Sequence, residues 1–300
     1  LKMEHKKPGY LYILIAGILW GSIGLFVNLL KAQGAVPQTI AFLRIGTAAL
    51  LLIPFMLASG GSRMFRIPQQ GLLACAALGI FCQAMFNISY NVSIQNVGVA
   101  TASVLLYSAP IFVCVMSKIF FRENIGRTKR IALLINILGC VLTVTNGDFS
   151  AISFSVLGVV TGVLAGFLYA LMTIISKMAT ENYHPLTVLF YSFVFGAAAI
   201  ALIARPWRNL EDVLSLRFTL TAFGYGLIPT VGSYIFYLRG LSCGLETSKL
   251  PVIASIETVV AAMIGILLFR EAIGLFKLLG IACVLVSIAI MNRKRENTNA

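Results

Sequence analysis

The chain has 300 residues, of which 59% are hydrophobic and only 11% are charged. Soluble domains carry about 25% charged residues, so this composition excludes a water-soluble globule. At about 20 apolar residues per span, it supplies enough apolar sequence for about ten transmembrane helices. The formal net charge of +13 comes mostly from basic residues in short loops and tails, which indicates contacts with lipid headgroups rather than with nucleic acid.

Ten apolar segments follow one another along the chain, separated by turn-forming or charged residues. The longest loop, residues 206–217, is too short to fold as a soluble domain. We therefore predict an all-α polytopic membrane protein with ten transmembrane helices. Their predicted ranges are residues 10–31, 36–58, 70–94, 98–121, 127–146, 155–178, 185–205, 218–240, 245–269 and 273–292.

An internal repeat divides the chain into two halves. Phe121-Arg122-Glu123, at the end of the fourth segment, recurs as Phe269-Arg270-Glu271 at the end of the ninth, 148 residues later. We interpret residues 1–148 and 149–300 as two five-helix repeats. Because five is an odd number, the repeats must be inverted relative to one another in the membrane. Inverted repeats place a transporter's binding site at their interface near the bilayer midplane.

These features resemble the drug/metabolite transporter superfamily, of the EamA type. The resemblance rests on Trp20-Gly21, Phe42-Leu43-Arg44, the paired Phe-Arg-Glu helix ends and residues 247–249 and 255–257, and it covers nearly the whole chain. It implies a secondary transporter that moves small metabolites such as amino acids by alternating access, commonly as an exporter, with or without proton coupling. One departure is Thr258, where the related pattern often has proline. Pro251, earlier in the same helix, could supply a kink instead.

Among the charged residues inside predicted helices, Arg44, Lys249 and Glu257 stand out, because a charge at the bilayer centre costs about 2.5–3.5 kcal/mol. In one interpretation Arg44 and Lys249 face a central cavity and attract an anionic substrate group, while Glu257 serves as a proton or counter-ion site. In the other, Arg44 and Glu257 form a structural ion pair and Lys249 extends to the membrane interface. The sequence leaves both interpretations open.

Aromatic residues with a polar tip, and two asparagines four positions apart, would suit a cavity for an amphipathic metabolite. Interfacial belts, core packing and interhelical hydrogen bonds use the same residue types. The predicted substrate-binding residues are Trp20, Arg44, Asn87, Tyr90, Asn91, Tyr107, Tyr169, Tyr234, Tyr237 and Lys249, with Glu257 as the proton or counter-ion residue.

An organic-phosphate or nucleotide-sugar exchanger of the same superfamily is the alternative function, with Arg44 and Lys249 as phosphate clamps. Catalysis is disfavoured because His5 and His184, the only histidines, stand apart from any cluster of metal ligands. The six cysteines lie in or beside apolar segments without metal-type spacing and are interpreted as packing residues. ATP-binding and dinucleotide-binding motifs are missing from the sequence.

We therefore predict a chain that is not an enzyme and has no cofactor or metal. Its expected partners are a small-molecule substrate and the lipid bilayer, not nucleic acid, and it is expected to be a monomer or a homodimer. A membrane enzyme, a channel or a receptor would be the alternatives from other classes. A catalytic dyad inside the membrane or a cytoplasmic partner domain would have favoured them.

Lysine and arginine residues are distributed unevenly between the two sides of the predicted bundle. With a cytoplasmic N-terminus, fifteen of them lie on the inner side and six on the outer side, and Arg44 and Lys249 lie within spans. This bias favours a cytoplasmic membrane protein with both chain ends in the cytoplasm. The inner cations are Lys2, Lys6, Lys7, Arg63, Arg66, Lys118, Arg122, Arg127, Lys129, Arg130, Lys177, Arg239, Arg293, Lys294 and Arg295; the outer ones are Lys31, Arg205, Arg208, Arg217, Arg270 and Lys277.

Topology reporters test this orientation. A reporter fused before Lys2 and another fused after Arg295 should both be active only in the cytoplasm, because the inner cations outnumber the outer ones. A reporter inserted in the loop 206–217 should be active only outside and serves as the control. A C-terminal reporter that is active only outside would show that the number of spans is wrong.

Overall fold

The computed structural model describes residues 6–151 and 154–292, and this part of the chain contains helices and loops but no β-strand. The first repeat contains α1 (Lys6–Gly21), α2 (Ile23–Ala32), α3 (Pro37–Gly60), the 3₁₀ turn η1 (Gly61–Phe65), α4 (Gln69–Ala77), the π-helix η2 (Leu78–Met85), α5 (Phe86–Leu106), α6 (Ala109–Phe121) and α7 (Arg127–Thr145). The second contains the 3₁₀ turn η3 (Phe149–Ala151), α8 (Val156–Asn182), α9 (Pro185–Ala204), the short α10 (Trp207–Val213), α11 (Leu216–Gly226), the π-helix η4 (Leu227–Gly232), α12 (Ser233–Ser242), the 3₁₀ turn η5 (Thr247–Lys249), α13 (Leu250–Ala254), α14 (Ile256–Phe269) and α15 (Leu275–Asn292).

The ten predicted spans are all present as helical segments, and the predicted fold class is confirmed. Several spans consist of more than one helix. The first is α1 followed by α2, the third includes the π-helix η2, and the eighth includes the π-helix η4 at the corresponding place. The predicted boundary between the third and fourth spans is not a loop. Instead two helices, both within α5, meet directly at a kink at Gly98, whose φ of 78° and ψ of 166° are not helical and turn the chain within one residue.

The fourth and ninth spans are interrupted near their middle. The fourth breaks at Tyr107 and Ser108, between α5 and α6, and Pro110 lies in the first turn of α6. The ninth breaks at Ser255, between α13 and α14. Pro251 does not cause that break, because it lies in the first turn of α13, where a residue without an N–H group is tolerated.

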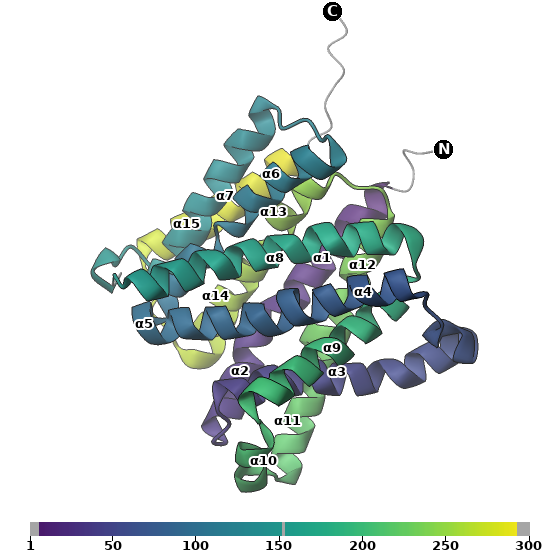
Figure 1. The fold of residues 1–300 in the computed structure, drawn as a ribbon. Helices are drawn as coiled ribbons and strands as arrows, with labels where there is room; N and C mark the ends of the chain where they lie inside the picture. The colour runs from purple at the N-terminus through teal and green to yellow at the C-terminus, as the bar shows by residue number, and fades with distance from the viewer. Residues whose placement is uncertain (1–5, 152–153, 293–300) are drawn as a thin grey trace, which may run out of the picture.

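The two repeats pack their helices in the same way (Figure 1). In the first, α5 and α6 lie against α8 of the second; in the second, α12 and α14 lie against α1 of the first. The paired helices α7 and α15 lie at one edge of the bundle, at the upper left, and α3 and α9 lie at the other, at the lower right. The largest buried apolar cluster lies between α1, α3, α9 and α12.

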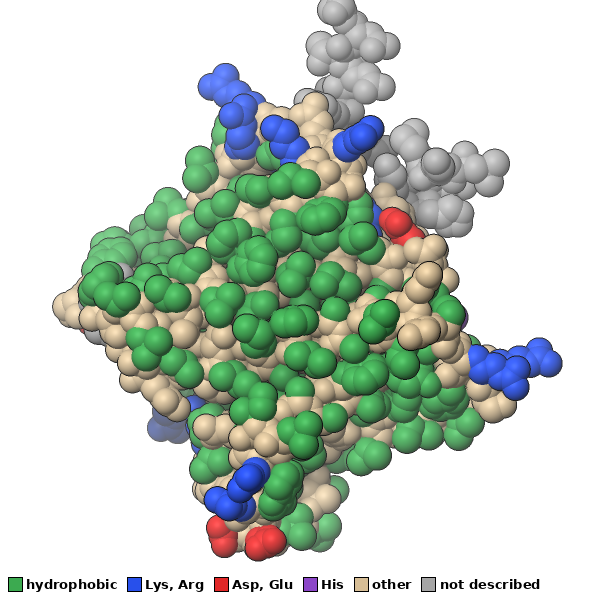
Figure 2. Space-filling view, viewed as in Figure 1, with side chains coloured by type: hydrophobic (Ala, Val, Ile, Leu, Met, Phe, Trp, Pro, Cys, Tyr) green, Lys and Arg blue, Asp and Glu red, His purple; other side chains and the backbone are tan. Residues whose placement is uncertain are grey.

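The surface has the character of a membrane protein (Figure 2). Hydrophobic side chains cover most of the visible face, and Lys and Arg side chains gather at its margins. Eight helical segments of the described chain are long and apolar enough to cross a bilayer, and α6 is a shorter apolar helix. We call the end of the bundle at which α1 begins and α15 finishes the terminal end, and the other the opposite end. Lys2, Arg293, Lys294 and Arg295, which contribute to the charge bias, lie outside the described residues.

The pairing of α7 with α15 depends on close approach of the two backbones. A Cβ atom on Gly280 would lie 2.5 Å from the backbone nitrogen of Thr143 and 2.7 Å from the carbonyl oxygen of Gly139. These neighbours are backbone atoms, so they cannot move aside as a flexible side chain can. The small residues let the two helices meet at van der Waals distance, which stabilises helix pairs in a membrane.

Gly280→Ala should therefore destabilise the protein by about 1–3 kcal/mol, the usual effect of overpacking a core. The measurement is the midpoint of thermal unfolding in one detergent. Gly24→Ala is the control, because a Cβ atom at Gly24 would have no neighbour within 4 Å, and alanine favours helix by up to about 1 kcal/mol. An unchanged midpoint for Gly280→Ala would show that α7 and α15 can move apart without loss of thermal stability.

Candidate substrate-binding site

The helix breaks bring polar and aromatic residues to the centre of the bundle. Trp20 lies at the end of α1, two residues before the break at Ser22. Tyr107 lies at the break between α5 and α6, and Glu257 lies in the first turn of α14, directly after the break at Ser255. At a break the backbone loses part of its helical hydrogen bonding, so polar side chains accumulate there.

An aromatic cluster joins the two repeats. The ring of Trp20 lies 5.5 Å from that of Tyr234 and 5.1 Å from that of Tyr237, both on α12. The hydroxyl group of Tyr237 is 2.8 Å from that of Thr173 on α8. Trp20 and Tyr237 are both buried. Three of the predicted site residues are therefore in mutual contact at the interface between the repeats.

Arg44 approaches this cluster from α3. Its Nη2 atom is 3.4 Å from Oε1 of Gln83 on η2, and the amide nitrogen of Gln83 donates to the hydroxyl of Tyr234 at 2.9 Å. The Nε atom of Arg44 is buried and has no hydrogen-bond partner among the described residues. Gln83 was not among the predicted site residues. An amide in an apolar segment was visible in the sequence, but only its position on the π-helix connects it to Arg44.

Glu257 lies deep within the protein and keeps part of its surface accessible. The positive end of the α14 helix dipole favours an acid in the first turn, which offsets part of its desolvation cost. The ion pairs of the described chain join Lys129, Lys177, Lys249 and Lys277 to acids and involve neither Arg44 nor Glu257. Tyr234 lies within electrostatic reach of both Arg44 and Glu257. Arg44 and Glu257 are therefore not paired with each other, although both act electrostatically on Tyr234.

The remaining predicted tyrosines are coupled electrostatically to Glu257. Tyr90, Tyr107 and Tyr169 all lie within electrostatic reach of its carboxyl group. The hydroxyl of Tyr107 is 3.2 Å from that of Thr258, and the hydroxyl of Tyr90 is 2.9 Å from that of Ser103. The hydroxyls of Tyr90 and Tyr107 therefore already have protein partners. We call Trp20, Arg44, Gln83, Tyr234, Tyr237 and Glu257 the central site.

Asn87 and Asn91 lie elsewhere. They line a cavity of about 360 Å³ near the opposite end, together with residues of α3 and α9 and with Arg205 and Arg208. The side-chain amide of Asn87 donates to the backbone carbonyl of Gln83 at 2.6 Å, a bond within one helix. The two asparagines share a helix face, as predicted, but that face is not the one that carries Tyr90.

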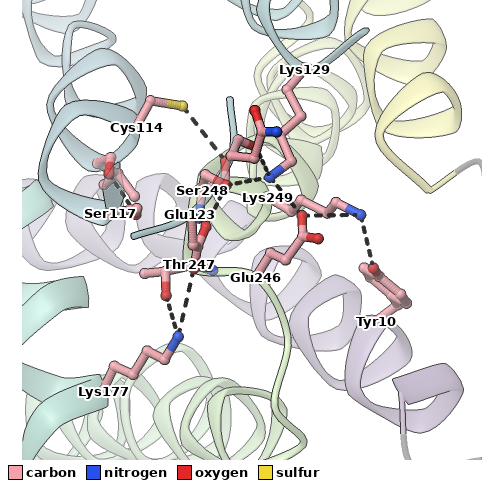
Figure 3. Close-up of polar contacts among 12 residues, drawn as sticks. Tyr10, Cys114, Ser117, Glu123, Lys129, Lys177, Glu246, Thr247, Ser248 and Lys249 are labelled. Carbon is pink, nitrogen blue, oxygen red and sulfur yellow. Dashed lines mark hydrogen bonds and ion pairs between the residues drawn. The ribbon is translucent and has the colours of Figure 1, made fainter. Parts of the chain in front are cut away.

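Lys249 also lies outside the central site. Its Nζ atom is 3.4 Å from a carboxylate oxygen of Glu246 and 3.5 Å from the hydroxyl of Tyr10, at the terminal end (Figure 3). This placement leaves Arg44 as the only one of the two intramembrane cations near Trp20 and Tyr234. It agrees with the interpretation in which Lys249 extends toward the membrane interface.

Figure 3 shows a network of charges at the terminal end, which we call the Glu123 cluster: Glu123, Lys129, Lys177, Glu246, Thr247, Ser248 and Lys249. The carboxylate of Glu123 accepts hydrogen bonds from the backbone N–H groups of Thr247 (2.5 Å) and Ser248 (3.0 Å) and from the Ser248 hydroxyl (2.6 Å). It therefore caps the beginning of the ninth span. Lys177 lies 3.6 Å from the same carboxylate.

Glu246 joins Lys129 and Lys249 in this cluster. Its carboxylate lies 2.6 Å from Lys129 Nζ. Partial burial alone would raise the pKa of Glu246, but the hydrogen bond from Lys129 and the charges of both lysines outweigh it and hold the pKa below its usual value. The ion pairs of Glu246 therefore persist in mildly acidic solution. Sequence reasoning singled out Glu123 as part of a repeated motif, but not as a cap.

Metal-binding groups are not apparent in the part of the chain that the structure describes. It contains no group of three or more His, Cys, Asp or Glu side chains that could hold an ion. The six cysteines are free, and four of them are buried. The chemistry of the central site is therefore that of one guanidinium, one carboxyl group, an amide and aromatic rings.

Comparison with known proteins gives consistent matches over the whole chain. A family model described as the EamA-like transporter family matches residues 7–145 and 156–293. An uncharacterized transporter of Archaeoglobus fulgidus is 27% identical over 96% of this chain and 97% of its own length. The uncharacterized inner membrane transporter YicL of Salmonella typhimurium is 24% identical, with 97% of each chain covered.

Two further matches bear on function and fold. The pseudopaline exporter CntI of Pseudomonas aeruginosa is 25% identical over 80% of each chain. One crystal structure superposes with a TM-score of 0.79 at 17% identity and covers 96% of this chain and 97% of its own, which shows a shared fold. The family match spans both repeats and nearly every residue of the described structure. The chain belongs to the EamA-like transporter family and is a membrane transporter of the drug/metabolite transporter superfamily.

Proposed function

We propose that this transporter exports small zwitterionic metabolites of the amino-acid class by alternating access through the central site. The observation that carries this proposal is that Arg44 and Glu257 form no ion pair with each other, while Tyr234 lies within electrostatic reach of both. A buried charge without an opposite charge is costly. A substrate that carries one carboxylate and one ammonium group would supply both missing partners at once.

The proposed binding mode follows from the chemistry of each group. The guanidinium of Arg44 would bind the substrate carboxylate, and its free Nε atom leaves a donor for a bidentate contact. The carboxylate of Glu257 would bind the ammonium group. The rings of Trp20 and Tyr234 would pack against the apolar part of the substrate and contribute a cation–π contact.

Export is supported by the similarity to CntI, which is an exporter, and alternating access by the inverted repeats and the broken helices around the site. An exchanger of organic phosphates would need several cations at one place. Lys249 is paired with Glu246 at the terminal end, so the central site contains Arg44 alone, which disfavours that alternative.

The first test is counterflow of labelled amino acids into proteoliposomes that contain the purified protein. Arg44→Ala should weaken substrate affinity by about 10- to 100-fold, because hydrogen bonds to a charged group contribute about 1.5–3 kcal/mol. Arg44→Lys should restore only part of the activity, since an ammonium group lacks the planar fork. Arg217→Ala, at an exposed position, is the control. Folded Arg44→Ala protein with normal transport would contradict the proposal.

The second test concerns proton coupling through Glu257. If the substrate ammonium and a proton compete for this carboxyl group, wild-type export should depend on pH between about pH 5.5 and 8.5, a range that brackets the shifts known for buried carboxyl groups. Glu257→Gln has nearly the same shape and should abolish the pH dependence while counterflow remains measurable. Transport by the wild type that is constant over this range would exclude the proton role and leave Glu257 as a counter-ion for the substrate.

A further inference from the structure

The two repeated Phe-Arg-Glu segments have the same backbone. Helices α6 and α14 both end in a left-handed residue, Arg122 with φ of 52° and Arg270 with φ of 54°. The N–H group of the next residue then bonds back into its helix. Glu123 donates to the carbonyl of Ser117 at 3.2 Å, and Glu271 to that of Gly265 at 3.1 Å. Both glutamate side chains therefore start from equivalent positions at opposite ends of the bundle.

The two side chains nevertheless have different partners. Glu123 reaches across to the other repeat and caps Thr247 and Ser248, and its side chain is only 9% exposed. Glu271 stays with its own repeat and pairs with Lys277 at 2.8 Å, and its side chain is 52% exposed. Lys277 is itself the repeat partner of Lys129, which lies next to the Glu123 cap.

The segments that the two glutamates could cap are also related by the repeat. The offset of 148 residues places Thr247 and Ser248 opposite Val99 and Ala100, the first turn after the bend at Gly98. Thr247 is fully buried, whereas Val99 is 60% exposed. The backbone of α6 lies close to η5 and α13, but that of α14 makes little contact with α5 in the described chain.

These differences define the conformation of the described structure. The terminal end is closed, because α6, η5 and the Glu123 cap bring the fourth and ninth spans together there. At the opposite end the corresponding segments lie apart. In an inverted-repeat protein, exchanging the conformations of the two repeats would close the opposite end and open the terminal end.

We propose that Glu271 and Lys277 form the gate of the opposite end. When that end closes, Glu271 turns to accept hydrogen bonds from the backbone N–H groups of Val99 and Ala100. In the same transition, Glu123 at the terminal end releases Thr247 and Ser248. As an acceptor, the Glu271 carboxylate needs only backbone N–H groups at the start of a helix. The absence of hydroxyl groups on Val99 and Ala100, which replace Thr247 and Ser248 in the other repeat, therefore does not prevent this cap. This inference rests on the proposed alternating access, but not on the identity of the substrate.

The test is a pair of distance measurements between spin labels, in a background whose six native cysteines are replaced by alanine. One pair, Asn124→Cys with Ser242→Cys, reports on the terminal end. The other, Ala272→Cys with Asn96→Cys, reports on the opposite end, and all four positions are exposed. Unchanged gel-filtration behaviour in detergent confirms that each variant is folded.

Glu123→Gln should lengthen the distance at the terminal end and shorten the distance at the opposite end. Adding Glu271→Gln should then reduce the population with the short opposite-end distance by about tenfold, the loss expected for hydrogen bonds to a charged acceptor. Glu211→Gln, an exposed acid on α10, replaces Glu271→Gln in the control and should leave both populations unchanged.

Two results would overturn the proposal. The opposite end could close equally well with Glu271→Gln, which would show that this glutamate is not its gate. Alternatively, opening the terminal end could leave the opposite end unchanged. Ser248→Ala, which removes the 2.6 Å bond to Glu123, is the milder variant if Glu123→Gln does not fold. Because the distances are measured without substrate, failure of the amino-acid proposal would leave this result standing.

Discussion

The structure depends on the requirement that backbone polar groups in hydrocarbon find partners within the protein. Continuous helices meet this requirement by themselves, but several spans of this chain are broken. At two of these breaks a serine hydroxyl satisfies a backbone carbonyl. The hydroxyl of Ser22 donates to the carbonyl of Leu19 at 2.7 Å, and that of Ser255 donates to the carbonyl of Val252 at 2.6 Å. The central site exists because these breaks admit polar residues to the interior.

The charged residues of the central site show a second balance, between the stability of the fold and the binding of a ligand. Arg44 has only uncharged partners, Gln83 at 3.4 Å and the hydroxyl of Tyr225, and Glu257 has no ion pair in the described chain. Such groups lower stability, and the protein compensates in part through the dipole of α14 and the tyrosines around Glu257. Residues that weaken the fold and lie together at a repeat interface are more easily understood as partners of a ligand than as parts of a core.

The repeats show how similar sequences form different contacts. Glu123 and Glu271 leave their helices with equivalent backbones, yet one is buried beneath the other repeat and one is exposed. The difference comes from the segments opposite them, because Thr247 is buried while Val99 is exposed. The two inverted repeats therefore have different conformations in the same structure. A pair of repeats that can exchange these conformations is the two-state element that alternating access needs.

The sequence by itself determined the class of the protein, the number of its spans and the repeat, and it indicated every residue that we group as the central site except Gln83. Hydropathy and the 148-residue offset are local patterns, and the bilayer leaves helices as the only solution for such segments. The tertiary structure decided where the side chains of Gln83, Lys249 and the two asparagines lie. The rotation of each helix about its axis, set by packing against neighbours far away in the chain, determines whether a side chain meets Arg44, the Glu123 cluster or the cavity at the opposite end. The cap that Glu123 places on Thr247 and Ser248, 124 and 125 residues away, depends on the same packing.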